Sequence, residues 1–274
     1  MFWIAKFFTT FAKGKINNRN MKKLLLSVCA LALAFGVQAQ KAQKTQSDAE
    51  LGKKWYVAER YSKALPYLER ASEAGDVDSK ARLAYMIYTA QVPEYSMDQD
   101  EAMNMLDECI EKGSTLAMER KGMCLLAFPP ETKENRLKAI EILKEASDKG
   151  SGDASANLFN AYANGITSYA RNEVYVEPND SLALVYIKKA CEQGNQTGKA
   201  FVGLYTYNGT KGYTQDKAAG VKMMEEANAM STRFFATDCF EPAKALVEYY
   251  KVNGRTAKAT PIVTLLKKFH PTEY

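Results

Sequence analysis

Apolar residues recur in four stretches of identical length along the chain, and each stretch ends in glycine. The four are KALPYLERASEAG, EAMNMLDECIEKG, KAIEILKEASDKG and LALVYIKKACEQG, at 63–75, 101–113, 138–150 and 182–194. Each has alanine at its second place, an aliphatic residue at its sixth and a small residue at its ninth. Offsets of four and three put these positions on one stripe of an α-helix. The pattern therefore predicts four copies of one helix, each followed by a glycine in the left-handed conformation.

A second helical pattern precedes each copy, so the helices come in pairs. We term the preceding helices A and the recurring ones B. A helices are predicted at 48–61, 77–90, 115–128, 153–164 and 198–208, and a fifth, weaker B helix at 214–230. The closing glycines of the B helices follow one another after 38, 37 and 44 residues. A period in this range is typical of a stacked repeat array, whose terminal repeats are atypical because they cover the last apolar face.

These patterns divide the chain into four segments. We expect an upstream extension with a signal peptide at 1–39, a polar entry segment at 40–47, the repeat array at 48–231 and capping helices at 232–274. The capping segment is predicted to hold one helix pair, at 239–252 and 256–269. The longest connection, 166–179, is predicted to be a loop, and strand content is expected to be negligible.

The A helices carry small residues at the positions expected to face the B helix of the same pair, and two positions depart from that rule. The sixth and ninth residues after each closing glycine are mostly alanine or glycine, which lets paired helices approach closely. Glu119 and Phe159 replace a small residue in two of the pairs. We therefore expect these two pairs to pack differently from the others.

The repeat resembles a known family. The pattern A-x-x-x-[L/I]-x-x-A-x-x-x-G after a helix rich in Ala, Gly and Tyr, seen most fully in GKAFVGLYTYNG at 198–209, is similar to Sel1-like repeats, which are longer relatives of the tetratricopeptide repeat. The resemblance implies an all-α fold, a right-handed α-solenoid of stacked antiparallel helix pairs with the A helices on its concave face. It also implies an adaptor or scaffold that binds other proteins, and it carries no shared catalytic residues.

The N-terminal segment has the anatomy of a secretory signal peptide. Lys22 and Lys23 precede an apolar run over 24–37, and Val37-Gln38-Ala39 has the small–x–small form of a cleavage site. The sequence therefore predicts cleavage after Ala39 and a periplasmic or secreted protein that is not inserted in the membrane. An uncleaved anchor is the alternative, although the run is shorter than the roughly 20 residues that a bilayer core needs. Whether translation starts at Met1 or at Met21 stays open.

Net charge gives no argument for a nucleic-acid partner. The whole chain carries 37 basic and 32 acidic residues, but 1–39 contains six of the basic residues and no acid. The remainder is therefore close to neutral, with 31 basic and 32 acidic residues. A protein that binds nucleic acid or an anionic membrane through its net charge would be clearly basic.

Motifs for catalysis, metals and cofactors are missing from the sequence. The single histidine, His270, stands five residues from the end of the chain, where a catalytic base is poorly held. No His-based or CxxC metal motif occurs, and neither GxxxxGK[ST] nor GxGxxG is present. We therefore expect no metal, no cofactor and no enzyme. Cys109 and Cys124 could form a disulfide after export, but a pair of buried thiols is favoured.

Aromatic residues are the candidates for partner binding. The candidates on the predicted A helices are four of the tyrosines there, namely Tyr85, Tyr88, Tyr162 and Tyr205. Three further candidates, Tyr169, Arg171 and Tyr175, lie in the 166–179 connection, where the repeat does not require them. Tyrosine and arginine dominate binding energy in protein interfaces. The alternatives are that the A-helix tyrosines are core residues and that the connection is a tolerated insertion.

The sequence thus predicts an exported scaffold that binds a protein or peptide partner in the cell envelope. The hypothesis places the partner on the concave A-helix face, with 166–179 as one wall. Two alternatives stay open: an enzyme acting on a cell-wall or glycan substrate, and a structural envelope component. A scaffold should show an extended groove without clustered acids, whereas an enzyme should show converging carboxylates in a closed pocket. A structural component should self-assemble. The identity of the partner and the oligomeric state are open.

Overall fold

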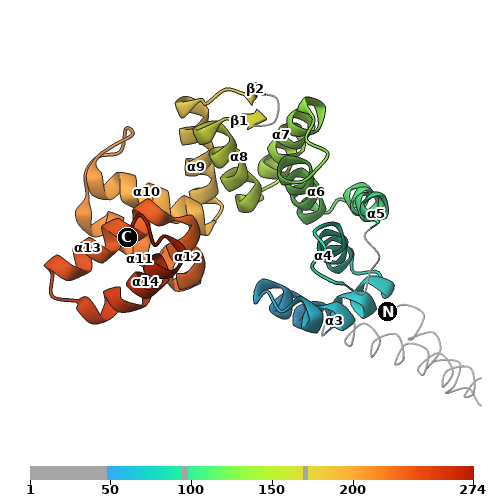
Figure 1. The fold of residues 1–274 in the computed structure, drawn as a ribbon, viewed down its shortest axis with the longest axis horizontal. Helices are drawn as coiled ribbons and strands as arrows, with labels where there is room; N and C mark the ends of the chain where they lie inside the picture. The colour runs from blue at the N-terminus through green and yellow to red at the C-terminus, as the bar shows by residue number, and fades with distance from the viewer. Residues whose placement is uncertain (1–47, 94–97, 169–171) are drawn as a thin grey trace, which may run out of the picture. The chain divides into compact units, whose positions relative to one another are not determined.

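The computed structural model describes residues 48–93, 98–168 and 172–274, and most of these lie in α-helices (Figure 1). The chain divides into two compact units, 1–79 and 80–274, and each is described by itself. The predicted signal peptide, its cleavage site and the polar segment 40–47 lie outside the described residues, as do Tyr169 and Arg171.

The described part of the first unit contains one complete helix pair. Residues 48–57 form its A helix and α3 (Tyr61–Glu73) its B helix. Leu68, at the sixth place of the repeat, is fully buried. Arg70 Nε and Nη2 donate to the two carboxylate oxygens of Asp48 at 2.9 and 3.0 Å, so a bidentate ion pair joins α3 to the first residue of the A helix.

The second unit also consists largely of helix pairs. Its A helices are α4 (Val77–Tyr88, whose first three residues belong to the first unit), α6 (Thr115–Ala127), α8 (Gly152–Asn164) and α10 (Gln196–Asn208), and its B helices are α5 (Gln99–Glu111), α7 (Lys133–Asp148), α9 (Asp180–Glu192) and α11 (Lys217–Met230). From α5 to α11 each helix packs against the next along the chain. The A helices α6, α8 and α10 also contact one another in that order. The prediction of an all-α array of stacked helix pairs is confirmed.

The four junctions from a B helix to the next A helix share the same backbone conformation and hydrogen bonds. The glycines closing the four predicted B helices all have positive φ, and the next residue donates its backbone N–H to the carbonyl of the ninth-place residue. The side chain of that same next residue then caps the following A helix by accepting a backbone N–H. The capping residues are Asp76, Ser114, Ser151 and Asn195. One residue therefore ends one helix and starts the next, which makes the junction tight.

Close approach within pairs depends on small residues, as the sequence predicted. A Cβ added to Gly122 of α6 would lie 2.6 Å from Leu143 Cγ of α7, so glycine is required where these helices touch. Phe159 of α8, a departure from the small-residue rule, is buried and its ring lies 5.2 Å from that of Phe201 on α10. Its bulk therefore fills the space between successive A helices.

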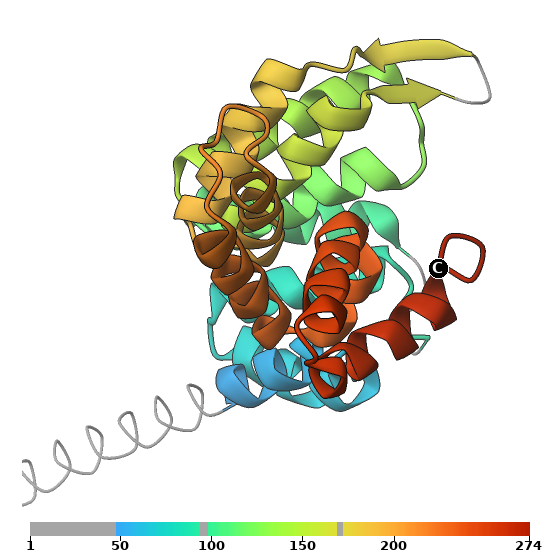
Figure 2. The same cartoon turned by 90° about the vertical axis from the view of Figure 1, so that its left-hand side faces the viewer.

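The prediction that 166–179 is a loop was wrong for residues 166–168 and 173–176. Strands β1 (Ile166–Ser168) and β2 (Glu173–Val176) form an antiparallel hairpin with an irregularity between Ile166 and Thr167 (yellow arrows in Figure 2). The run EVYV of β2 is rich in β-branched and aromatic residues, which favours a strand. The hairpin packs beside α7, where Glu173 lies 3.6 Å from Lys133.

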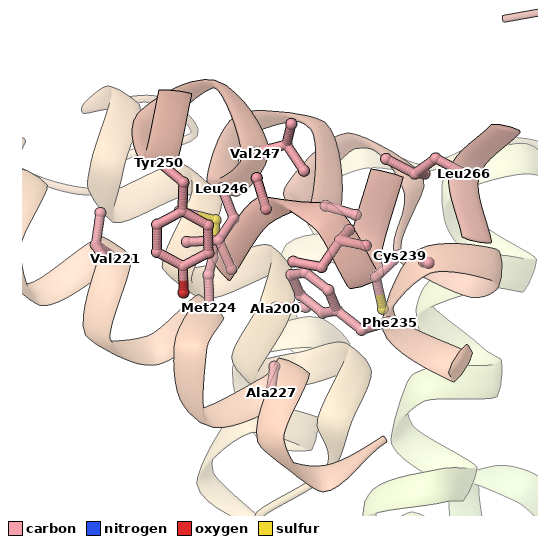
Figure 3. Close-up of a cluster of buried hydrophobic side chains, with 14 residues drawn as sticks. Ala200, Val221, Met224, Ala227, Phe235, Cys239, Leu246, Val247, Tyr250 and Leu266 are labelled. Atoms are coloured by element: carbon pink, nitrogen blue, oxygen red, sulfur yellow. The ribbon is translucent and has the colours of Figure 1, made fainter. Parts of the chain in front are cut away.

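Three helices close the C-terminal end of the array, one more than predicted. They are α12 (Thr232–Asp238), α13 (Phe240–Val252) and α14 (Thr256–Phe269). Their buried side chains, including Phe235, Leu246 and Leu266, form one cluster with Ala200 of α10 and Met224 of α11 (Figure 3). The cluster covers the apolar face that the last repeat would otherwise expose. His270 follows α14, and its Nε2 lies 3.2 Å from the carbonyl oxygen of Thr237.

The two cysteines considered for a disulfide, Cys109 and Cys124, are thiols with no exposed surface. Burial raises the pKa of the Cys124 thiol to about 12, so this thiol stays protonated and unreactive at neutral pH.

Candidate functional site

A cavity of about 360 Å³ opens on the A-helix face of the second unit. Three successive A helices and α12 line it, and the residues that contribute are Glu119, Arg120, Met123, Asp153, Ala156, Asn157, Asn160, Asn195, Thr197, Phe234 and Asp238. The α8 residues among them are spaced three or four apart, which places them on one face of that helix. Most of the lining side chains are polar. The cavity is therefore a feature of the array itself, formed where the A helices lie in a row.

Glu119 is the most deeply placed acid of the cavity, with 4% of its surface exposed. Its Oε2 accepts a hydrogen bond from the Ser151 hydroxyl at 3.0 Å, while its Oε1 accepts none. Burial raises the pKa of this carboxyl above its ordinary value, and the positive charge of Arg120 offsets only part of that effect. Glu119, which stands where the repeat usually has a small residue, thus contributes a polar side chain to the cavity.

Arg120 is held against the cavity wall by three neighbours. Its guanidinium lies 5.0 Å from the centre of the Tyr85 ring, a cation–π distance, and Nη1 lies 3.3 Å from the Met123 sulfur. Nη1 also lies 3.3 Å from Glu119 Oε1. The guanidinium therefore supplies the positive charge nearest to the buried carboxylate and is fixed in place by its packing.

The other polar groups of the cavity come from α8, the start of α10 and the end of α12. Asn195 Nδ2 donates to Asp153 Oδ1 at 2.6 Å, which links the first turn of α8 to the cap of α10. Asn157 and Asn160 lie one turn apart on α8, and their side-chain amides take part in no hydrogen bond within the described residues. Asp238 is exposed and ends α12. The cavity thus offers unused donors and acceptors beside negative charge.

Replacing Glu119 by glutamine should change how stability depends on pH. Because the folded-state pKa of Glu119 is raised, its favourable contribution is complete below the unfolded pKa of about 4.3 and is lost as pH rises through the folded pKa. Glutamine keeps an acceptor for Ser151 and does not ionise. In urea unfolding at several pH values between about 4 and 7.5, the stability of Glu119→Gln relative to the parent should therefore rise with pH. Parallel curves for the two proteins would contradict the burial of this charge.

Metal sites and membrane-spanning helices are two further features to consider in the part of the chain that the structure describes. There, no three His, Cys, Asp or Glu side chains are grouped as ligands for a metal ion. Within the same residues, no helix has both the length and the apolar character that crossing a membrane requires.

Comparisons with known proteins concern the fold. No protein-family model and no curated protein matches the chain. Among solved structures, a Sel1 repeat protein from Oxalobacter formigenes matches with a TM-score of 0.53 and 17% identity, over 84% of this chain and 86% of that one.

The chain has the Sel1-like repeat fold.

Two further solved structures show similarity at lower scores. A protective antigen of uropathogenic Escherichia coli with the same repeat fold has a TM-score of 0.49 and 19% identity, over 85% of this chain and 46% of that one. A Sel1 repeat protein from Klebsiella pneumoniae has a TM-score of 0.44 and 21% identity, over 75% of this chain and 95% of that one.

The A-helix tyrosines of the Sel1-like array have different surroundings. Tyr88 is buried and its hydroxyl donates to the Pro129 carbonyl oxygen at 3.1 Å. Tyr162 is buried and its ring stacks on Tyr186 with centroids 5.6 Å apart. Tyr85 and Tyr205 are half-buried, and the Tyr85 ring lies against the guanidinium of the cavity residue Arg120. Core packing accounts for Tyr88 and Tyr162, and a role of these tyrosines in partner binding stays a prediction.

The hairpin candidate Tyr175 is also largely buried, with 6% of its surface exposed. The described part of the 166–179 segment lines no part of the cavity and packs beside the B helix α7. As a wall of a binding site this segment stays a prediction, and the structure gives Tyr175 a packing role.

Sequence reasoning missed the polar residues of the cavity. Asn157 and Asn160 could have indicated the site from the sequence. They are two amide side chains one turn apart in an A helix whose other residues are mostly apolar or small. Asp238 could not have been found in this way, because α12 itself was not predicted. Its place beside α8 and α10 follows from the packing of α12 against α10.

Proposed function

We propose that this chain is a non-catalytic repeat scaffold, exported to the cell envelope, that binds a protein partner through an extended segment laid on the A-helix face. The observation that carries the proposal is the open cavity on α6, α8 and α10, with side-chain amides that take part in no hydrogen bond within the described residues. Sites with a few convergent polar groups in a concavity are the usual binding sites of proteins.

The spacing of Asn157 and Asn160 suits a peptide backbone. Residues three apart on a helix have Cβ atoms about 5–6 Å apart. In an extended chain, every second residue repeats after roughly 6.6 Å. Each amide has both a donor and an acceptor. The pair can therefore hold two backbone groups of a partner segment that runs along α8.

A double replacement of these amides should remove binding without affecting the fold. Peptides selected from a random display library on the purified chain would be titrated by fluorescence polarisation against the parent and against Asn157→Ala/Asn160→Ala. Loss of two hydrogen bonds worth about 0.5–1.5 kcal/mol each should weaken affinity about fivefold to about 150-fold. Alanine favours helix, so the melting temperature should not fall.

Asn164→Ala is the matched control, because Asn164 lies on the same helix, is exposed and does not line the cavity. It should bind as the parent does. Equal affinity of the double variant and the parent would move the site away from the cavity. A library that yields no binding peptide would argue against peptide binding altogether.

Export is the second part of the proposal, and the N-terminal sequence supports it. The basic, apolar and small-residue regions over 21–39 match a cleavable signal peptide. We expect the mature protein to begin at Gln40. Mass spectrometry of the N-terminal peptide from native cells tests this, and mature protein that retains residues 1–38 would contradict it.

A second candidate function is hydrolysis of a glycan, and one observation favours it. Glu119 is a buried carboxyl with a raised pKa, and it shares the cavity with two further carboxyl side chains, Asp153 and Asp238. Glycosidases use a pair of carboxyl groups, and the general acid of the pair has a raised pKa. The scaffold proposal expects no release of reducing ends when the purified chain is incubated with peptidoglycan. Release that disappears in Glu119→Gln would establish the enzyme instead.

A further inference from the structure

We propose that the A-helix cavity receives the cationic side chain of a lysine or arginine from the partner segment. This inference rests on the proposed function and names the chemistry that the site recognises. It concerns the cavity lined by α6, α8, the start of α10 and α12, and the charges that the described residues leave there.

Negative charge exceeds positive charge in the cavity. Glu119, Asp153 and Asp238 contribute three carboxylates, and Arg120 contributes the one cationic side chain of the lining. Arg120 lies against Glu119, so it balances that residue first. The excess negative charge favours a positively charged ligand over a neutral or an acidic one.

Asp153 and Asp238 contact neutral groups among the described residues. Asp153 Oδ1 accepts a hydrogen bond from the neutral Asn195 amide, and Asp238 Oδ2 contacts the neutral hydroxyl of Thr237. Neither carboxylate forms an ion pair within the described ranges of the chain. Both can therefore accept charge-assisted hydrogen bonds from a ligand, which are stronger than bonds between neutral groups.

Glu119 adds an independent observation that points to a ligand. Its Oε1 is buried and accepts no hydrogen bond, although Arg120 Nη1 lies 3.3 Å away. A buried carboxylate oxygen without a hydrogen bond is costly unless something completes its shell. An ammonium or guanidinium group entering the cavity supplies the missing donor.

The size and walls of the cavity also fit one long basic side chain. A volume of about 360 Å³ is near the lower end of the range for ligand sites, roughly 300–1,000 Å³. Met123 and Phe234 provide apolar surface at its edge, and Phe234 is partly exposed. Lysine and arginine bury an aliphatic stem against such surface while the charged end reaches polar groups.

The test uses peptides from the display selection described above and a variant that removes charge with little change of shape. Asp153→Asn/Asp238→Asn neutralises both unbalanced carboxylates, and Glu111→Gln/Glu131→Gln removes the same charge at two exposed positions outside the cavity. Binding peptides should share a lysine or arginine. Its replacement by norleucine should weaken binding to the parent and to the control about tenfold or more, and binding to the cavity variant less than about threefold.

Each outcome decides between the inference and the function on which it rests. Selected peptides that bind the cavity but share no basic residue would overturn the inference and leave peptide binding intact. An equal norleucine effect on parent and cavity variant would also overturn it, because the basic residue would then bind elsewhere. A library without any binder would overturn both. Exchange of arginine for lysine in the best peptide tells which cation the cavity prefers.

Discussion

Leu143→Asp is expected to unfold the part of the array around α6 and α7. Leu143 occupies the sixth place of its B helix and has no exposed surface. Truncating a buried leucine costs about 2–5 kcal/mol, and an unpaired buried carboxylate adds to that cost. The total is comparable to the whole stability of a typical domain, about 5–15 kcal/mol. Circular dichroism should show reduced helix content at 25 °C or a much lower urea midpoint.

Leu137→Asp is the matched control, because Leu137 lies on the same helix with 41% of its surface exposed. Aspartate at that position meets water, so the urea midpoint should stay close to that of the parent. If the two variants unfolded alike, the helix face assigned to the core would be wrong.

Gly122→Val is expected to destabilise the same pair by overpacking. The added side chain has no room, because a Cβ at this position would already lie 2.6 Å from Leu143 Cγ. Overpacking of a well-packed core costs about 1–3 kcal/mol. Shortening the opposing side chain should relieve the clash. Gly122→Val should therefore be far less harmful in a Leu143→Ala background, with a coupling energy of about 1–2 kcal/mol in a double-mutant cycle.

Leu246→Ala provides the comparison for that cycle. It is the same truncation at a fully buried leucine, but in α13 of the C-terminal cluster. The effects of Gly122→Val and Leu246→Ala on the free energy of unfolding should simply add. If the coupling energy of Gly122→Val were the same with Leu246→Ala as with Leu143→Ala, the relief of the clash would not depend on the contact between α6 and α7.

The helix pairs could be predicted because the same physical demand recurs in each of them. Leu68, Leu106, Leu143 and Ile187 all stand at the sixth place of a B helix and are all fully buried. The glycines that close the B helices all have positive φ. Gly122 is required because α6 and α7 approach each other closely at that position. Because the same pattern occurs four times, each copy supports the helix assignment of the other three. The family resemblance and the fold therefore agree.

The cavity was harder to predict because its lining residues stand at positions that differ from one repeat to the next. Glu119 stands out in the sequence as an exception to the small-residue rule, but its contact with Ser151 at the start of the next A helix depends on how the two A helices pack. Asp238 reaches the cavity through α12, a short helix with no counterpart in the other repeats. The hairpin does not follow from the repeat, because the strand propensity of 173–176 is local and has no counterpart in the other helix pairs. Non-periodic features arise from packing between distant segments.

The central claim is that a partner segment lies on the A-helix face of the second unit. Hydrogen–deuterium exchange of the purified chain, with and without the best selected peptide, tests it most directly. The account predicts slower exchange in α6, α8 and α12, with no change in α7, α9 or the hairpin of β1 and β2. Protection confined to the B helices or to the hairpin, with α8 unaffected, would contradict it.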